Sequence, residues 1–199
     1  LSSSGSNRYT FSMPASAVTV QATFVKESSF TDVAVDSYCY DAVLWAVEEG
    51  ITNGTTATTF SPNAACTRGQ IVTFLWRAAG SPAPKGTAKV PADVLPGSYC
   101  YDAVAWALEN GITNGTSAKT FSPDATVTRA QVVTFLWRAN GQPAAGNSGF
   151  ADVSADKYYA TAVAWAVSQR ITTGTGFGVF SPDAACTRAQ IVTFLYRAN

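Results

Sequence analysis

One phrase occurs three times in this chain, and the repetition constrains the fold more than any other feature of the sequence. The copies begin at Cys66, Val127 and Cys186, and each runs through Thr-Arg-x-Gln into an apolar stretch that ends in Arg-Ala. Such repetition identifies the folding unit before any other pattern is considered. We therefore divide the chain into an N-terminal segment at 1–26, unit 1 at 29–80, unit 2 at 90–141 and unit 3 at 149–199.

Each unit is predicted to form a helix, a loop and a second helix. In unit 1, residues 38–49 place apolar side chains along one face at helical spacing. Gly50 follows, as Gly111 does in unit 2, at a point where the end of a helix favours a residue with positive φ. Unit 3 has Arg170 there, which we expect to cost up to about 1 kcal/mol.

The second helix of each unit is expected to begin with a capping box. In this arrangement a threonine hydroxyl accepts a hydrogen bond from the backbone N–H three residues on, and the glutamine at that position bonds back to the threonine N–H. The three pairs are Thr67 with Gln70, Thr128 with Gln131, and Thr187 with Gln190. Apolar residues at helical spacing follow each box and predict a buried face.

A unit of two helices cannot cover its own apolar surface, so three units must pack on one another. The cysteines favour a closed arrangement over an open stack. Cys39 and Cys100 lie near the start of the first helices of units 1 and 2, while Cys66 and Cys186 lie just before the second helices of units 1 and 3. If each first helix touches the second helix of the unit before it, cyclically, the predicted disulfides are Cys66–Cys100 and Cys39–Cys186. Four unlinked, buried cysteines are the alternative.

The first 26 residues differ from the repeats. Alternating apolar residues on either side of Pro14-Ala15-Ser16 predict two short strands joined by a turn. The segment from Tyr9 to Phe24 resembles the tail of β-rich repeats in bacterial surface proteins. No secretory signal opens the chain, so we interpret it as part of a larger protein whose N-terminal region is the cargo.

Composition argues against several functions. Lys and Arg number 13, as do Asp and Glu, so a neutral chain gives no electrostatic reason to bind nucleic acid. The apolar runs are too short to span a bilayer, so we expect no membrane insertion. The chain has no histidine and no CxxC pair, which argues against a zinc site and against Ser-His or Cys-His nucleophiles. We expect neither a metal nor a cofactor.

Over residues 29–199 the motifs together resemble three surface-layer homology repeats. They are Phe30-Thr31-Asp32-Val33, a tryptophan-bearing helix, Thr-Asn-Gly, Phe-Ser-Pro and Thr-Arg-x-Gln. The resemblance implies a mainly α, pseudo-threefold domain that anchors proteins non-covalently to the bacterial envelope. Its usual ligand is a secondary cell-wall polysaccharide, often with ketal-linked pyruvate, and its location is the cell surface. The family pattern ends in Thr-Arg-Ala-Glu, whereas this chain has Gln at the last position and Gly69 in unit 1.

Three arginines at the start of the second helices are the leading ligand-binding candidates: Arg68, Arg129 and Arg188. A cation is disfavoured at a helix N-terminus, so its recurrence suggests a bound anion, held by the guanidinium and by free backbone N–H groups together. A pyruvate carboxylate would suit this arrangement. The alternative is a salt bridge to an aspartate at the start of a unit: Asp32, Asp93 or Asp152. These aspartates are otherwise expected to cap local backbone or to orient the arginine.

Tryptophans and glycines complete the candidate site. For the tryptophans, the choice lies between stacking on a sugar and packing in the core: Trp45, Trp106 and Trp165. The glycines are expected to supply positive φ in a tight turn or to let a ligand approach closely: Gly54, Gly115 and Gly174. Unit 3 has Thr173 where its siblings have Asn53 and Asn114, so we expect Arg188 to contribute least to binding.

Three functions compete on these observations. A carbohydrate-binding anchor without catalysis is the leading interpretation, and a structural module that assembles a surface lattice is the second. A glycosidase needs a pair of carboxylates. Glu48, Glu49 and Glu109 lie on predicted helix exteriors and do not recur in every unit, so we predict no enzyme activity.

Overall fold

The computed structural model describes residues 2–3, 9–10, 15–17, 19 and 28–199. This part of the chain is mainly α, with two helices in each unit, as the sequence predicts. The helices are α1 (Tyr40–Glu48), α2 (Arg68–Ala78), α3 (Tyr101–Glu109), α4 (Arg129–Ala139), α5 (Ala160–Ser168) and α6 (Arg188–Ala198). No helix of the described residues is long and apolar enough to cross a membrane.

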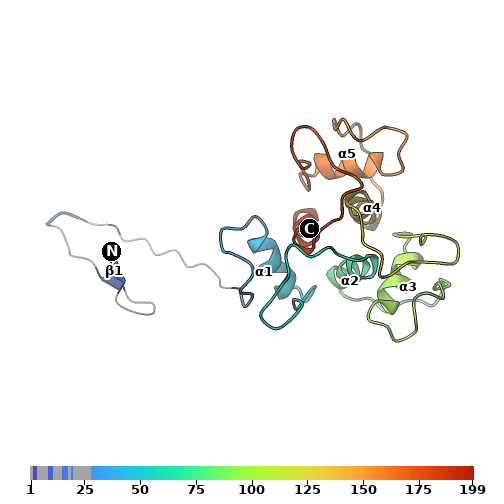
Figure 1. Cartoon of the computed structure of the whole chain (residues 1–199), viewed down its shortest axis with the longest axis horizontal. Coiled ribbons are helices and arrows are strands. Elements are labelled where there is room, and N and C mark those ends of the chain that lie inside the picture. Colours follow the sequence, from blue (N-terminus) through green and yellow to red (C-terminus); the bar gives the residue numbers. More distant parts are fainter. Residues whose placement is uncertain (1, 4–8, 11–14, 18, 20–27) are drawn as a thin grey trace.

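The three units close into a ring with threefold-like symmetry. Helices α2, α4 and α6 meet at the centre, and α1, α3 and α5 lie in three lobes around them (Figure 1). Each lobe helix packs on the central helix of the preceding unit, α3 on α2, α5 on α4, and α1 on α6. The last pair joins unit 1 to unit 3. The cyclic packing order inferred from the cysteine positions is therefore confirmed.

A triangle of backbone hydrogen bonds closes the ring at its axis. The Cys66 N–H donates to the Cys186 carbonyl, Cys186 donates to Val127, and Val127 donates to Cys66, each over 3.0 Å. All three side chains are fully buried. Because every member is both donor and acceptor for a different unit, each unit relies on the other two for its backbone pairing.

The two predicted disulfides are wrong, because the structure holds four free, buried thiols, at Cys39, Cys66, Cys100 and Cys186. The thiols contact polar groups of their own units instead. The Cys66 thiol donates to Gln70 Oε1 at 3.2 Å, and Cys100 Sγ lies 3.9 Å from Ser98 Oγ. Burial raises the pKa of Cys66 to about 11 and of Cys186 to about 12, so both stay protonated at neutral pH.

The N-terminal segment contains a short antiparallel pair, β1 (Ser2–Ser3) and β2 (Tyr9–Thr10). Ser2 lies opposite Thr10, and Ser3 lies opposite Tyr9. The sequence instead predicts a strand around Tyr9 followed by a turn at Pro14 and a second strand at 18–24. That second strand falls outside the described residues, except for position 19.

All three predicted capping boxes are present, and each begins a central helix. The Thr128 hydroxyl accepts from the Gln131 N–H at 3.3 Å, and Gln131 Oε1 accepts from the Thr128 N–H at 3.2 Å. The boxes at Thr67 and Thr187 have the same two bonds. The central helices are thus started by local sequence, independently of the ring.

We expect Thr128→Ala to lower the free energy of unfolding by about 1 kcal/mol, because the first turn of α4 loses its side-chain acceptor. Urea unfolding followed by circular dichroism measures the change. Thr128→Ser is the control, since serine keeps the acceptor and should leave stability nearly unchanged. Equal stability of the alanine variant and the parent would contradict the role of the box.

The second residue after each lobe helix has positive φ, as the sequence predicts. Gly50 and Gly111 both have φ of 66°, and Arg170 has 59°. We expect Arg170→Gly to raise the free energy of unfolding by up to about 1 kcal/mol, because glycine adopts this conformation without a Cβ penalty. Thermal unfolding beside Arg170→Ala separates the backbone effect from loss of the side chain. A glycine variant no more stable than the alanine variant would refute the argument.

Candidate functional site

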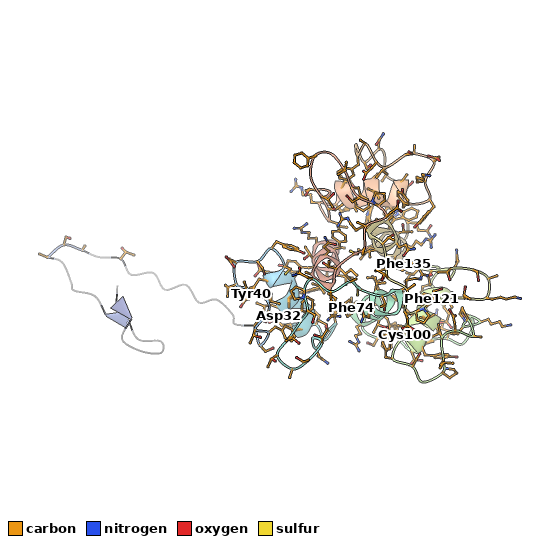
Figure 2. The ribbon with its side chains drawn as sticks, viewed as in Figure 1. Asp32, Tyr40, Phe74, Cys100, Phe121 and Phe135 are labelled. Carbon is orange, nitrogen blue, oxygen red and sulfur yellow. The ribbon has the colours of Figure 1, made fainter. Side chains whose placement is uncertain are left out.

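A buried arginine opens each central helix, and Arg68 shows the arrangement. Its Nε donates to the Phe121 carbonyl of the next unit at 2.9 Å. Its Cζ lies 4.8 Å from the centre of the Phe121 ring and 5.4 Å from that of Phe135, within range of cation–π attraction. Figure 2 labels both phenylalanines, Phe121 in the loop of unit 2 and Phe135 on α4. The other two sets are Arg129 with Phe180 and Phe194, and Arg188 with Phe60 and Phe74.

The aspartate at the start of each unit positions an arginine indirectly. Asp93 accepts hydrogen bonds from the backbone N–H groups of Phe121 at 2.9 Å and Ser122 at 2.7 Å. Phe121 is also the residue whose carbonyl holds Arg68. Desolvation raises the pKa of Asp93, but the bonds donated by backbone N–H groups, together with the charge of Arg68, outweigh it and hold the pKa below its usual value.

Asp32 and Asp152 clamp the phenylalanines of their own units in the same way, at Phe60 and Phe180. These phenylalanine carbonyls accept from the Nε atoms of the remaining two arginines. Among the residues that the structure describes, no carboxylate forms a salt bridge with a helix-opening arginine. The alternative of a direct Arg–Asp bridge is therefore not what the structure shows.

The first-turn amides of the central helices are already hydrogen-bonded, contrary to the expectation that they would meet an anion. The Arg68 N–H donates to the Ala125 carbonyl at 2.9 Å, and the Gly69 N–H donates to the Pro123 carbonyl at 2.8 Å. Helices α4 and α6 make the same bonds to the units that follow them. These amides join neighbouring units, so an anion would have to be held by the guanidinium group.

The guanidinium groups of Arg68 and Arg129 keep unused donors. In both residues Nη2 is buried without a partner among the described residues. An unpaired buried donor costs about 1–3 kcal/mol, and more when it is charged. Arg188 differs, because its Nη2 donates to Thr52 Oγ1 at 3.4 Å. Burial lowers the pKa of all three arginines, yet arginine stays charged at neutral pH.

Arg129 and Arg68 each line a groove built from all three units. The Arg129 groove, about 430 Å³ in volume, takes Tyr38 from unit 1, Arg129 from unit 2, and residues 172–175 with Arg197 from unit 3. The Arg68 groove, about 300 Å³, takes Arg68 from unit 1, residues 113–116 with Arg138 from unit 2, and Tyr158 from unit 3. Neither groove is complete without every repeat.

Each groove carries two arginines and no acidic side chain. The second arginine is fixed by its own unit: Arg197 Nη1 donates to the Ile171 carbonyl at 3.1 Å, and Arg138 Nη1 donates to Ile112 at 3.2 Å. Threonine hydroxyls and loop backbone supply further polar groups. Paired guanidinium groups among hydroxyls suit an acidic, hydroxyl-rich ligand. Within the described residues, no cluster of His, Cys, Asp or Glu could hold a metal ion.

The sequence patterns did not point to the second arginines or to Tyr38 and Tyr158, the tyrosines that line the two grooves. Both sets recur at equivalent positions in all three units, at Arg77, Arg138 and Arg197 and at Tyr38, Tyr99 and Tyr158. The tyrosines are 58–64% exposed. Their recurrence was the available signal. A basic residue near a helix C-terminus, however, is also expected from the helix dipole alone.

The loop glycines have the positive φ that the sequence predicts, with 85° at Gly54, 82° at Gly115 and 88° at Gly174. Gly115 and Gly174 also line the two grooves. Each loop faces the arginine of the preceding unit. Thr173 therefore belongs to the Arg129 groove, and the premise that it weakens the site of Arg188 is wrong.

The three candidate tryptophans lie away from the Arg68 and Arg129 grooves. Trp45 and Trp106 line a separate depression of about 180 Å³ at the C-terminal ends of the central helices. Trp45 packs against Tyr196 with ring centres 5.6 Å apart, and Trp165 is buried. The structure thus places all three in packing positions rather than in the grooves.

Comparison with known proteins shows what the sequence of this chain is similar to. The model of the S-layer homology domain matches residues 29–72, 93–133 and 149–192. A surface-layer 125 kDa protein of Lysinibacillus sphaericus is 31% identical over 100 residues, which are 50% of this chain and 8% of that protein. An endoglucanase of Bacillus sp. (strain KSM-635) is 31% identical over 110 residues, 55% of this chain and 11% of the enzyme. The chain thus spans about a tenth of these relatives, and its three matched repeats place it in the S-layer homology domain family.

Proposed function

We propose that this domain anchors a bacterial surface protein by binding an acidic secondary cell-wall polysaccharide in the grooves between its units. Attachment to the cell wall is the general role of S-layer homology domains, and the family places the chain at the cell surface. We propose further that the ligand is a polysaccharide with carboxylate groups, such as pyruvate ketals, and that it binds in the Arg68 and Arg129 grooves.

One observation carries this proposal. Arg68 and Arg129 each hold a buried, unpartnered Nη2 in a groove that has a second arginine and no acidic side chain. A carboxylate oxygen of a ligand would accept charge-assisted hydrogen bonds from these donors, which have no acceptor among the described residues. The Arg188 position has a protein partner for Nη2 and so offers less to a ligand.

Self-assembly in a surface lattice is the second candidate, because one relative is a surface-layer protein. The endoglucanase match covers 11% of that enzyme, and we assign no catalysis to the grooves. For residues 1–26, the end of a β-rich module that leads to the cargo region remains our prediction.

The test is binding to purified cell-wall polysaccharide from Lysinibacillus sphaericus, measured by titration calorimetry. The matched control is the same polymer with its carboxyl groups reduced to alcohols, which keeps the sugar backbone. We expect binding to the native polymer and a large loss after reduction. Assembly of the protein into sheets without glycan, together with no binding to either polymer, would favour the lattice module and overturn the anchor.

A further inference from the structure

The loop of unit 3 displays a phenylalanine that has no counterpart in the other units. Phe177 is fully exposed and has φ of 52°, between Gly176 at 116° and Gly178 at 73°. Both faces of its ring are open to solvent. Exposing a large apolar side chain to water is unfavourable, and so is placing it in this backbone conformation. Folding stability therefore does not explain why phenylalanine stands at this position.

The equivalent positions in units 1 and 2 are Ala57 and Ala118, and their loops have the same length. The same backbone hydrogen bond closes the base of all three loops. The Thr175 N–H donates to the Val179 carbonyl at 2.9 Å, and the N–H groups of Thr55 and Thr116 donate to the carbonyls of Thr59 and Thr120. Only the tip differs. In unit 3, Gly176 and Val179 form a β-bridge that turns the chain sharply at Phe177.

The loop that carries Phe177 also lines the Arg129 groove, through residues 172–175. Phe177 lies two positions after Thr175, so their Cα atoms are within about 8 Å of each other. A ring at that distance from the groove can contact the sugar residue next to a charged sugar that is bound in the groove. The tip 176–178 has no charged side chain, so it lacks the basic residues with which a surface loop would hold anionic lipid.

We propose that Phe177 is a stacking platform for a sugar ring next to the acidic sugar in the Arg129 groove. The inference rests on the proposed function and extends it, because it makes the Arg129 groove a longer site than the Arg68 groove. An aromatic face suits the apolar C–H face of a pyranose, and a fully exposed ring can stack on a sugar without giving up contacts within the protein. The Arg129 groove would therefore bind longer saccharides better than short ones.

The experiment compares the parent with Phe177→Ala, Phe177→Trp and Val47→Ala. Val47 is an exposed apolar residue of α1 that lines neither groove, and it serves as the matched control. The probes are a methyl glycoside bearing a pyruvate ketal and a trisaccharide with the same ketal at one end. Calorimetry gives the affinity for each probe. Thermal unfolding checks that every variant is folded, as we expect, because the exposed Phe177 side chain does not stabilise the fold.

We expect Phe177→Ala to weaken trisaccharide binding roughly fivefold to tenfold and to leave the monosaccharide unchanged, with Phe177→Trp restoring the loss. Equal trisaccharide affinities in the parent and Phe177→Ala would overturn the platform while leaving the grooves intact. No binding of either saccharide by the parent would instead refute the proposed function. Loss of vesicle binding or of self-association in Phe177→Ala, with glycan affinity unchanged, would assign the residue to a lipid surface or a second copy and reject the platform.

Discussion

Arg68→Ala and Arg129→Ala should each weaken binding of a pyruvylated saccharide by about 1.5–3 kcal/mol, or roughly 10- to 150-fold, at the groove concerned. Among the described residues at the start of each central helix, the guanidinium is the group left to hold a carboxylate, since the first-turn amides are bonded to the next unit. Arg→Lys should recover only part of the loss, because an ammonium group lacks the planar pair of donors. Arg188→Ala should cost less, since Nη2 of Arg188 already donates to Thr52.

Two controls keep this result interpretable. Arg170→Ala removes one positive charge from an exposed position outside the grooves and should leave saccharide affinity unchanged. Arg68→Met keeps an apolar side chain between the Phe121 and Phe135 rings, so it separates loss of packing from loss of charge. If all three helix-opening arginines can be replaced together without loss of polysaccharide binding, the anion-site hypothesis is wrong.

Gly115→Ala should lower the free energy of unfolding by roughly 3 kcal/mol and abolish the Arg68 groove. Its φ is +82°, and an added Cβ would lie 2.5 Å from the Thr120 carbonyl oxygen and 2.8 Å from that of Ser117. The methyl group therefore meets backbone that cannot rotate away, in addition to the penalty of a left-handed conformation. Denaturant unfolding and saccharide affinity together measure the two effects.

The matched control is Gly111→Ala in the same unit. Gly111 has φ of +66°, but an added Cβ would meet nothing within 4 Å. Only the conformational penalty remains, so we expect a loss of about 1 kcal/mol with normal binding. Equal losses for the two variants would mean that the Gly115 loop can rearrange and that the close contacts do not constrain it.

Local patterns in the sequence predicted local structure well. The capping box at Thr128 and the positive φ at Arg170 each depend on residues within a few positions, and both are present. The cyclic order of the units could also be inferred, because four cysteines in three copies share one symmetry. The disulfides failed although the packing order was right. Contact between two helices does not fix where a thiol points, and Cys66 turns toward its own Gln70.

The composition of the grooves could not be predicted in the same way. Periodicity shows that Trp45 faces inward, but not whether it faces a groove or the end of the central bundle. Nor does a repeat pattern show that Tyr38 completes a site whose arginine and loop belong to two other units. Such placement depends on the tertiary packing of segments that are far apart in the sequence, such as Tyr38 and Thr172, and spacing along the chain does not encode it.

The closure of unit 3 onto unit 1 determines when the Arg129 groove forms during folding. Arg188 reaches the Phe60 carbonyl across 128 positions of sequence, and α6 is the last helix of the repeats. Such distant pairings form late and slowly in folding. Because Tyr38 enters its groove only when unit 1 meets unit 3, a chain whose α6 has not yet packed cannot form the Arg129 groove. The two grooves therefore form at different stages: the residues that line the Arg68 groove all precede α6, whereas the Arg129 groove waits for the ring to close.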